Sequence, residues 1–171
     1  MKAKRLKLKD LKAVPNINYK PEHCIKILSL DVASVTGWAV SRLEYGTWDF
    51  KTRKDESMGM KLIRLRSKLD EVKQLTNFHL IVYERPAGRF KNAIIHEAKM
   101  LGLIEEWCET NKIEYRAYSA TEIKMYATGK GSAGKPAMIK AAKDKLGYPG
   151  NDDNEADALW MLELAQSEYG Q

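Results

Sequence analysis

The sequence predicts an α/β fold in which a mixed five-stranded sheet carries helices on both faces. Short apolar runs at 25–31, 38–41 and 45–50 follow one another like the strands of a meander. Beyond residue 58, helical patterns and strand-like runs alternate, which is typical of a sheet wrapped by helices. No internal repeat or low-complexity tract interrupts this order, so a single sheet accounts for the pattern.

The first three strands are assigned from composition and turn signals. The run at 25–31 is short, rich in Ile and Leu, and bounded by turn residues, as a buried strand is. Thr36 and Gly37 are expected to turn the chain into the second strand at 38–41, and a third strand at 45–50 completes the meander.

Helices and strands then alternate up to residue 118. We expect a helix over 58–75, a strand over 79–84, a long helix from about 90 to 110 and a short strand over 112–118. The first of these helices is amphipathic, because apolar side chains recur at helical spacing at Leu62, Leu65, Leu69 and Val72.

The last third of the sequence predicts helices around a Gly-rich loop. Residues 119–122 (Ser-Ala-Thr-Glu) form a capping-box pattern that opens a helix. The Gly-rich loop spans 128–134, and helical signals return at Pro136 and from about residue 153.

Length and composition describe one globular domain. The 171 residues include 44% hydrophobic and 30% charged residues. No apolar stretch reaches the ~18 residues of a membrane span, and no signal peptide is visible, so we expect a cytoplasmic protein without a membrane partner. Cys24 and Cys108 lack zinc-type spacing and are expected to be reduced core thiols. The net charge of +6 favours a polyanionic partner.

The positive charge is concentrated at the N-terminus. We divide the chain into a basic arm and linker at 1–22 and a folded domain at 23–171, because Pro15 and Pro21 bracket a linker-like segment. The first twelve residues hold six basic residues and one acid. Two interpretations stay open, a solvated arm and an arm that contacts DNA phosphates.

Three carboxylates occupy positions where a charge is costly. Asp31 and Glu84 end strand-like runs, and Asp157 lies inside an apolar helical pattern. Singly, Asp31 could cap a turn, Glu84 could pair with Arg85, and Asp157 could be a surface charge. Together they predict a hard-oxygen site for Mg²⁺ or Mn²⁺, since strand-end acids meet where an α/β sheet opens its ligand crevice.

The start of the last helix offers a further ligand. Asp153 and Asn154 precede Asp157 by four and three residues, so both can share its helical face. Asp152 and Glu155 point elsewhere and are expected to be first-turn acids that favour the helix dipole. Two ions about 4 Å apart in such a site would activate water and stabilise a departing oxygen of a phosphodiester.

The loop at 129–135 nearly matches the nucleotide-binding pattern G-x-x-x-x-G-K-[ST]. Pro136 replaces the metal-binding hydroxyl and a helix, not a strand, precedes the loop, so we exclude ATP and expect no nucleotide cofactor. Free backbone N–H groups at a helix N-terminus still favour an anion such as a phosphate. A mobile basic surface loop is the plainer interpretation. Lys140, Lys143 and Lys145 either extend the charge or form a solvated face.

Two sets of motifs carry a family resemblance. Residues 27–31 and 36–39 resemble the first strand and turn of the ribonuclease H-like nucleases. More specifically, 122–124 (Glu-Ile-Lys), 128–135 and 155–159 (Glu-Ala-Asp-Ala-Leu) resemble the RuvC-type Holliday-junction resolvases in residue type, order and spacing. The resemblance covers roughly residues 25 to 165.

The resemblance implies roles for particular residues. It places two Mg²⁺ ions, for which Mn²⁺ can substitute, on Asp31, Glu84, Asp157 and one of the 153–154 pair. The family's usual fourth position holds Asn154 here, so Asp153 becomes the expected ligand. The resemblance also implies a catalytic role for Lys124 and Lys135, at the scissile phosphate and the metal-bound water. DNA contacts implied by the resemblance or by position fall on Lys124, Lys130, Lys135, Arg89 and Phe90, where Phe90 replaces the family's base-stacking aromatic or simply packs.

The resemblance therefore implies an endodeoxyribonuclease that resolves four-way DNA junctions by paired nicks, as a homodimer. The helix at 90–110 is the expected interface. Two alternatives stay open: a nuclease of the same fold that cuts flaps, forks or RNA–DNA hybrids, and a non-catalytic junction-binding protein.

Overall fold

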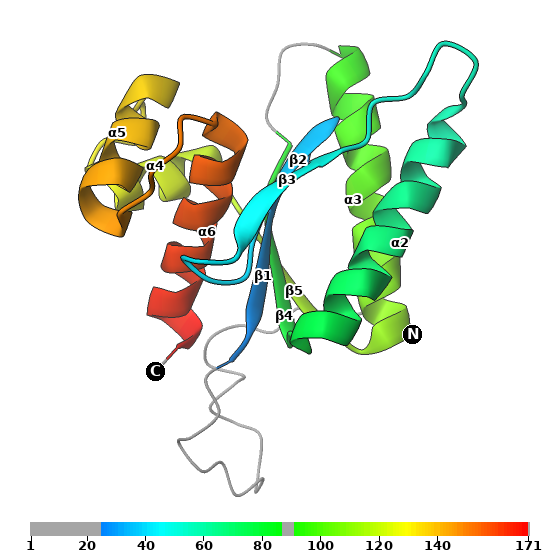
Figure 1. Ribbon diagram of the computed structural model, residues 1–171, viewed down its shortest axis with the longest axis horizontal. Helices are drawn as coiled ribbons and strands as arrows, with labels where there is room; N and C mark the ends of the chain where they lie inside the picture. The colour runs from blue at the N-terminus through cyan, green and yellow to red at the C-terminus, as the bar shows by residue number, and fades with distance from the viewer. Residues whose placement is uncertain (1–24, 87–90, 171) are drawn as a thin grey trace, which may run out of the picture.

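A five-stranded mixed sheet of order β3-β2-β1-β4-β5 forms the centre of the computed structural model, which describes residues 25–86 and 91–170 (Figure 1). The pairs β1–β2 and β2–β3 are antiparallel, whereas β1–β4 and β4–β5 are parallel, so the predicted mixed sheet is confirmed. The strands are β1 (Ile27–Asp31), β2 (Val35–Ala39), β3 (Tyr45–Asp49), β4 (Leu80–Glu84) and β5 (Glu114–Tyr118).

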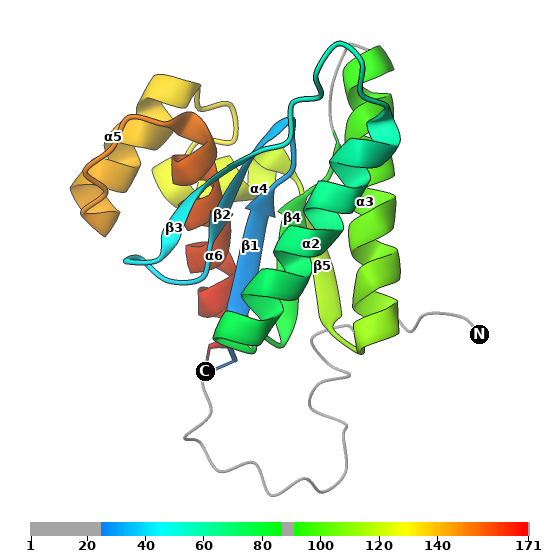
Figure 2. The ribbon, with the colours of Figure 1, turned by 45° about the vertical axis from the view of Figure 1, so that its right-hand side comes forward.

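Helices cover both faces of the sheet, as predicted (Figures 1 and 2). One face carries α2 (Met58–Thr76) and α3 (Lys91–Asn111), and the other carries α4 (Ala120–Thr128), α5 (Lys135–Leu146) and α6 (Asp153–Tyr169). Successive side chains of a strand point to opposite faces, so each central strand contributes to two cores and is mostly apolar on both faces, with Ser29 of β1 and Thr36 of β2 as buried polar exceptions. Among the described helices, none combines the length and apolar character needed to cross a lipid bilayer.

The second strand begins earlier than the sequence suggested. It starts at Val35, so Thr36 and Gly37 lie inside β2 and the predicted turn at these residues is wrong. A Cβ on Gly37 would lie 2.0 Å from the carbonyl oxygen of Asn154. The glycine is therefore required by the close approach of α6. The turn itself precedes Val35, where the Thr36 hydroxyl donates to the Ala33 carbonyl at 2.7 Å.

The buried stripe of α2 also begins one residue before the predicted one. Lys61, Leu65, Leu69 and Val72 are its buried residues, and Leu62 is only partly buried. Lys61 is 3% exposed, which is unusual for a lysine. The core-facing position was not evident from the sequence because a charged residue does not contribute to an apolar pattern. Cys108 on α3 is a buried thiol, as expected, and burial raises its pKa to about 12.

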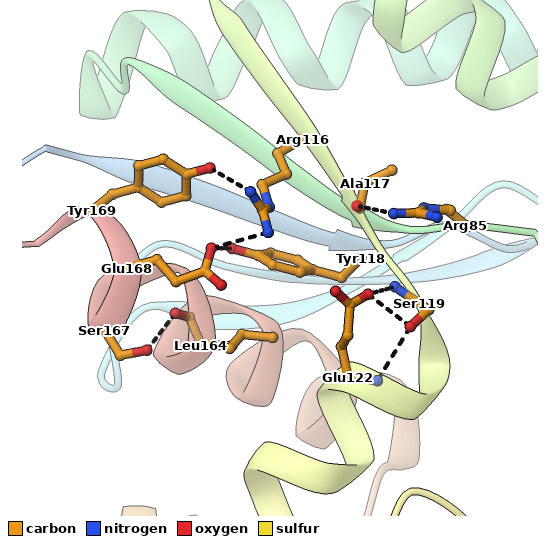
Figure 3. A network of polar contacts seen from close by, with 10 residues as sticks. All are labelled: Arg85, Arg116, Ala117, Tyr118, Ser119, Glu122, Leu164, Ser167, Glu168 and Tyr169. Atoms are coloured by element: carbon orange, nitrogen blue, oxygen red, sulfur yellow. Dashed lines mark hydrogen bonds and ion pairs between the residues drawn. The ribbon is translucent and has the colours of Figure 1, made fainter. Parts of the chain in front are cut away.

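The predicted capping box at the start of α4 is confirmed. The Ser119 hydroxyl accepts a hydrogen bond from the Glu122 backbone N–H at 3.2 Å, and the Glu122 carboxylate accepts one from the Ser119 N–H at 2.7 Å (Figure 3). Two orphan donors at the helix start are satisfied by this exchange. The helix ends at Gly129, whose φ of 76° suits glycine, and the loop to α5 follows.

The far end of α6 is anchored to the edge strand β5. The Arg116 guanidinium donates to the Tyr169 hydroxyl at 3.2 Å and pairs with the Glu168 carboxylate at 3.3 Å (Figure 3). The Tyr118 hydroxyl donates to the same carboxylate at 2.9 Å. These contacts fix the C-terminal turn of α6 against the sheet, so the start of the helix is held in place relative to the strand ends.

Candidate active site

Asp31 and Glu84 leave the sheet at the same edge. Asp31 is the last residue of β1 and Glu84 the last of β4. The two strands are parallel neighbours whose register runs up to the pair Leu30–Tyr83, immediately before the two acids. Carboxyl ends of adjacent parallel strands form the usual ligand crevice of such sheets. Both carboxylates are partly buried there.

Helix α6 brings two more carboxylates to this edge. The Ser29 hydroxyl donates to the Ala158 carbonyl at 2.7 Å, which ties α6 to β1 beside Asp157. Gly37 allows the first turn of α6 to approach β2. Asp153 and Asp157 are one helical turn apart, and both charges act on Asp31.

The electrostatics of these acids show that they are close enough to repel one another. Burial, followed by the charges of Asp157, Glu84 and Asp153, raises the pKa of Asp31 to about 8. Burial, followed by repulsion from Glu84 and Asp153, raises the pKa of Asp157 to about 6. The pKa of Glu84 is also raised, mainly by burial. In the chain without a cation, the cluster is therefore short of positive charge.

The carboxylates do not form a ready-made ligand group. Within the part of the chain that the structure describes, no three His, Cys, Asp or Glu side chains are arranged to hold a metal ion as they stand. One reason is visible at Asp153, whose carboxylate is ion-paired with Lys135. For Asp153 to bind a cation, this ion pair would have to open.

Two lysines supply positive charge to the cluster. Lys135, the first residue of α5, lowers the pKa of Asp31 and Asp157, and its own pKa is raised by the hydrogen bond to Asp153. Lys124 on α4 lowers the pKa of Glu84 and Asp157. Thus two of the three lysines that the sequence singled out, Lys124 and Lys135, lie near the acids. Lys130 lies on the loop between α4 and α5, and it contributes to none of these shifts.

The polar residues at the start of α6 have different roles. Asp152 is the N-cap, and its carboxylate accepts from the backbone N–H groups of Asn154 and Glu155. The Asn154 side-chain amide also donates to Asp152, at 3.1 Å. Glu155 accepts from the Tyr148 hydroxyl at 2.7 Å. Asp152 and Glu155 therefore stabilise the helix start, and Asn154 is engaged with the cap while Asp153 faces Lys135.

The remaining lysines of α5 are mostly occupied. Lys140 pairs with Asp144, Lys143 donates to the Asn151 side chain at 2.6 Å, and Lys145 donates to the Ala127 carbonyl at 2.7 Å. Lys140 and Lys143 line a surface hollow that also touches Lys135 and Asp153. Local structure explains these side chains better than a continuous DNA-binding face.

One acid near the site was missed by the sequence reasoning. Glu97 on α3 raises the pKa of Glu84, and its own pKa is raised by burial. No periodic signal separated it from other polar residues of the long helix, and only the packing of α3 beside β4 reveals it. Arg89 and Phe90, the expected DNA contacts after the second acid, lie outside the described residues, as does the N-terminal arm.

Comparison with known proteins places this geometry in a known fold. No family model and no curated relative matches the chain. The structure resembles that of Thermus thermophilus RuvC, with a TM-score of 0.68, 19% identity, and coverage of 84% of this chain and 93% of that one. T. thermophilus RuvC in complex with a Holliday junction substrate also matches, with a TM-score of 0.68, 20% identity, and coverage of 86% and 94%.

A more distant likeness is to Ydc2, the yeast mitochondrial Holliday junction resolvase, with a TM-score of 0.60, 11% identity, and coverage of 95% of this chain and 85% of that one. At these identities the likeness concerns the backbone architecture. The described chain thus has the ribonuclease H-like fold of the RuvC-type Holliday junction resolvases.

Proposed function

We propose that this protein is a metal-dependent endodeoxyribonuclease that resolves four-way DNA junctions. The observation that carries the proposal is the cluster of mutually repelling carboxylates at the sheet edge, Asp31, Glu84, Asp153 and Asp157. A protein that only bound DNA would gain nothing from acids that face phosphates. The fold is that of junction resolvases, one of which was solved with a Holliday junction substrate. Cleavage of DNA junctions is consistent with a cytoplasmic location, which we also propose.

The donor set fits a hard divalent cation. Carboxylate oxygens are the ligands that Mg²⁺ and Mn²⁺ prefer. Burial and repulsion raise the pKa of Asp31 and Asp157, and a cation among these groups would offset both penalties. We propose two Mg²⁺ ions, replaceable by Mn²⁺, held by Asp31, Glu84, Asp157 and Asp153. When bound, such ions would activate the attacking water and stabilise the departing oxygen.

The lysines of the site would act on the DNA phosphate. Lys135 has a side chain that is 74% exposed, so its ammonium can leave Asp153 for an incoming phosphate. Lys124 lies near Glu84 and Asp157, and it would stabilise charge at the scissile position. Lys130 would contact the backbone further out, from the α4–α5 loop. We retain Arg89 and Phe90 as proposed DNA contacts.

Paired nicks require two active centres, so we propose a two-fold homodimer that matches the symmetry of the junction. Most of the apolar stripe of α3 is used in packing on the sheet, through Met100, Ile104 and Trp107. Ile95 is nevertheless 49% exposed, and the exposed residues Ala98 and Gly102 follow it on the same face. A face of this kind supports α3 as the interface.

The decisive experiment compares DNA substrates. Labelled four-way, three-way, flap and linear duplex DNA, and an RNA–DNA hybrid, are incubated with the protein in Mg²⁺, and in EDTA as a control. We expect symmetric nicks in the four-way junction only with Mg²⁺, and none with the Asp31→Asn variant. Preferred cutting of flaps or hybrids would support a nuclease of the same fold with another substrate. Metal-independent binding without any cleavage would support a junction-binding protein.

A further inference from the structure

A buried lysine lies beneath the loop that follows Asp31. Lys61, at the core-facing stripe of α2, is 3% exposed. Its Nζ donates to the Ser34 Oγ at 2.9 Å. None of the ion pairs between described residues includes Lys61. A full positive charge is thus held inside the protein against a neutral hydroxyl.

This arrangement is unfavourable for stability alone. Burying an ammonium group is costly unless an opposite charge compensates it. An apolar side chain like those of Leu65 and Leu69, the next residues of the stripe, would fill the space without that cost. The loop does not need the lysine as a tether either. The Thr36 hydroxyl already bonds the Ala33 carbonyl, and the Phe50 N–H bonds the Ser34 carbonyl at 2.8 Å.

The direction of the hydrogen bond between Lys61 and Ser34 decides which ligands Ser34 can bind. An ammonium group can only donate, so the Ser34 oxygen must accept from Lys61. The hydroxyl proton of Ser34 then points away from Lys61. Because Ser34 is exposed, the pair presents to solvent an O–H donor with a positive charge directly behind it. An anion that accepts from Ser34 would gain from both groups.

The pair lies beside the proposed active site. Ser34 is three residues after Asp31, in the turn between β1 and β2. The bond from Phe50 brings the loop between β3 and α2 next to this turn, and both views place that loop at the end of the molecule where β1 ends (Figures 1 and 2). The loop adds the exposed basic residues Lys51, Arg53 and Lys54.

We propose that Lys61 and Ser34 form a binding site for one phosphate group of the DNA backbone, next to the scissile position. Ser34 donates directly to a phosphate oxygen, and Lys61 stabilises that contact from below through the same hydroxyl. The inference rests on the proposed function, because it takes DNA as the ligand. It adds a phosphate contact on the α2 side of the acids, opposite the lysines of α4 and α5.

The test uses junction binding in EDTA over a series of salt concentrations, so that cleavage does not interfere. Lys61→Met keeps the length and apolar body of the side chain and removes the charge. We expect roughly tenfold weaker binding and a shallower salt dependence, by about 0.9 in the log–log slope. Ser34→Ala, at an exposed position, should weaken binding comparably. Lys68→Met is the matched control, since Lys68 lies on the same helix, paired with Glu71, and should bind like wild type.

A phosphate scan locates the contact. Junctions that each carry one neutral methylphosphonate are compared in turn. Wild type should lose roughly tenfold in affinity at one phosphate, and Lys61→Met should lose clearly less at that same phosphate, because only the direct contact from Ser34 remains. Equal salt slopes and equal scan profiles for the two proteins would overturn the inference. A Lys61→Met protein that melts earlier but binds like wild type would likewise make Lys61 a structural residue.

Failure here is separable from failure of the proposed function. If wild type does not prefer four-way junctions to linear duplex, the junction function falls. A phosphate contact through Ser34 would still appear on any DNA that the protein binds.

Discussion

Lys135 and Asp153 form an ion pair that joins the first turn of α5 to the first turn of α6. Asp153 at the same time adds to the repulsion felt by Asp31 and Asp157, while Lys135 relieves it. Lys135 therefore partly neutralises the acid cluster when no metal is bound. A cation that entered the cluster would take over this role and release Lys135 toward a phosphate.

Asp31→Asn should stabilise the metal-free protein at neutral and higher pH. The pKa of Asp31 is raised from 3.8 to about 8 on folding. A raised pKa means that the carboxyl's contribution to stability is fully present below about pH 4 and is lost as the pH rises through 8. The amide of the variant carries no charge at any of these pH values, so it escapes that loss. Thermal melting in EDTA should therefore show a gain of roughly 1–4 kcal/mol for the variant at pH 8, shrinking toward pH 4.

Mg²⁺ provides the control for that measurement. Its addition should raise the melting temperature of wild type and have little effect on Asp31→Asn, because ligands that bind only the folded state stabilise it. Parallel melting curves for the two proteins across pH, with equal responses to Mg²⁺, would rule out the carboxylate cluster as the source of repulsion and as the metal site.

Lys135→Ala should reduce turnover more than affinity. A lysine beside the scissile phosphate stabilises charge that develops in the transition state, an effect worth roughly 2–4 kcal/mol. Single-turnover cleavage measures the effect on turnover, and equilibrium binding of the same junction measures the effect on affinity. Lys140→Ala is the matched control, because Lys140 lies on the same helix and pairs with Asp144. An equal loss in both variants would assign Lys135 to general electrostatic attraction.

Most of the fold follows from local signals, and the site follows from them only in part. Burial on both faces makes β1 and β4 mostly apolar, so the acids at their ends stand out in sequence. The structural roles of Gly37 and Lys61, by contrast, cannot be recognised in the sequence. Local signals predict a turn at Gly37, whereas its actual reason, the approach of Asn154 on α6, is a contact across more than a hundred residues. The buried position of Lys61 could not be predicted because a charged residue marks the end of an apolar pattern in sequence, even where its side chain is in the core.

Deleting the first 13 residues should weaken DNA binding and flatten its salt dependence. Six basic residues stand among the first twelve, and each phosphate that they neutralise releases counterions. Titrations of junction and linear duplex at several salt concentrations measure the slope, and the loss should be similar for both DNAs because counterion release depends on the number of phosphates neutralised. An unchanged slope would mark the arm as a bystander.

The protein should sediment as a homodimer at micromolar concentration. Ile95→Glu places a charge on the exposed apolar position of α3 and should give monomers that bind DNA but do not make paired nicks. Leu75→Glu, at an exposed apolar position of α2, is the matched control and should stay dimeric. A wild-type monomer both free and on junction DNA would exclude coordinated nicking and favour a flap or fork nuclease.

The fourth metal ligand is decided at the start of α6. Asp153 is paired with Lys135 and acts on the charges of Asp31 and Asp157. By contrast, Asn154 donates its amide to the helix cap Asp152. A carboxylate brings a full charge to a hard cation, whereas an amide oxygen brings only a dipole.

We therefore expect Asp153→Asn to reduce cleavage at least a hundredfold more than Asn154→Ala, on the order of 3 kcal/mol in transition-state stabilisation. High Mn²⁺ should recover part of the activity, because Mn²⁺ binds N/O sites more tightly than Mg²⁺. The reverse order of the two variants would make Asn154 the ligand and leave Asp153 only as the partner of Lys135.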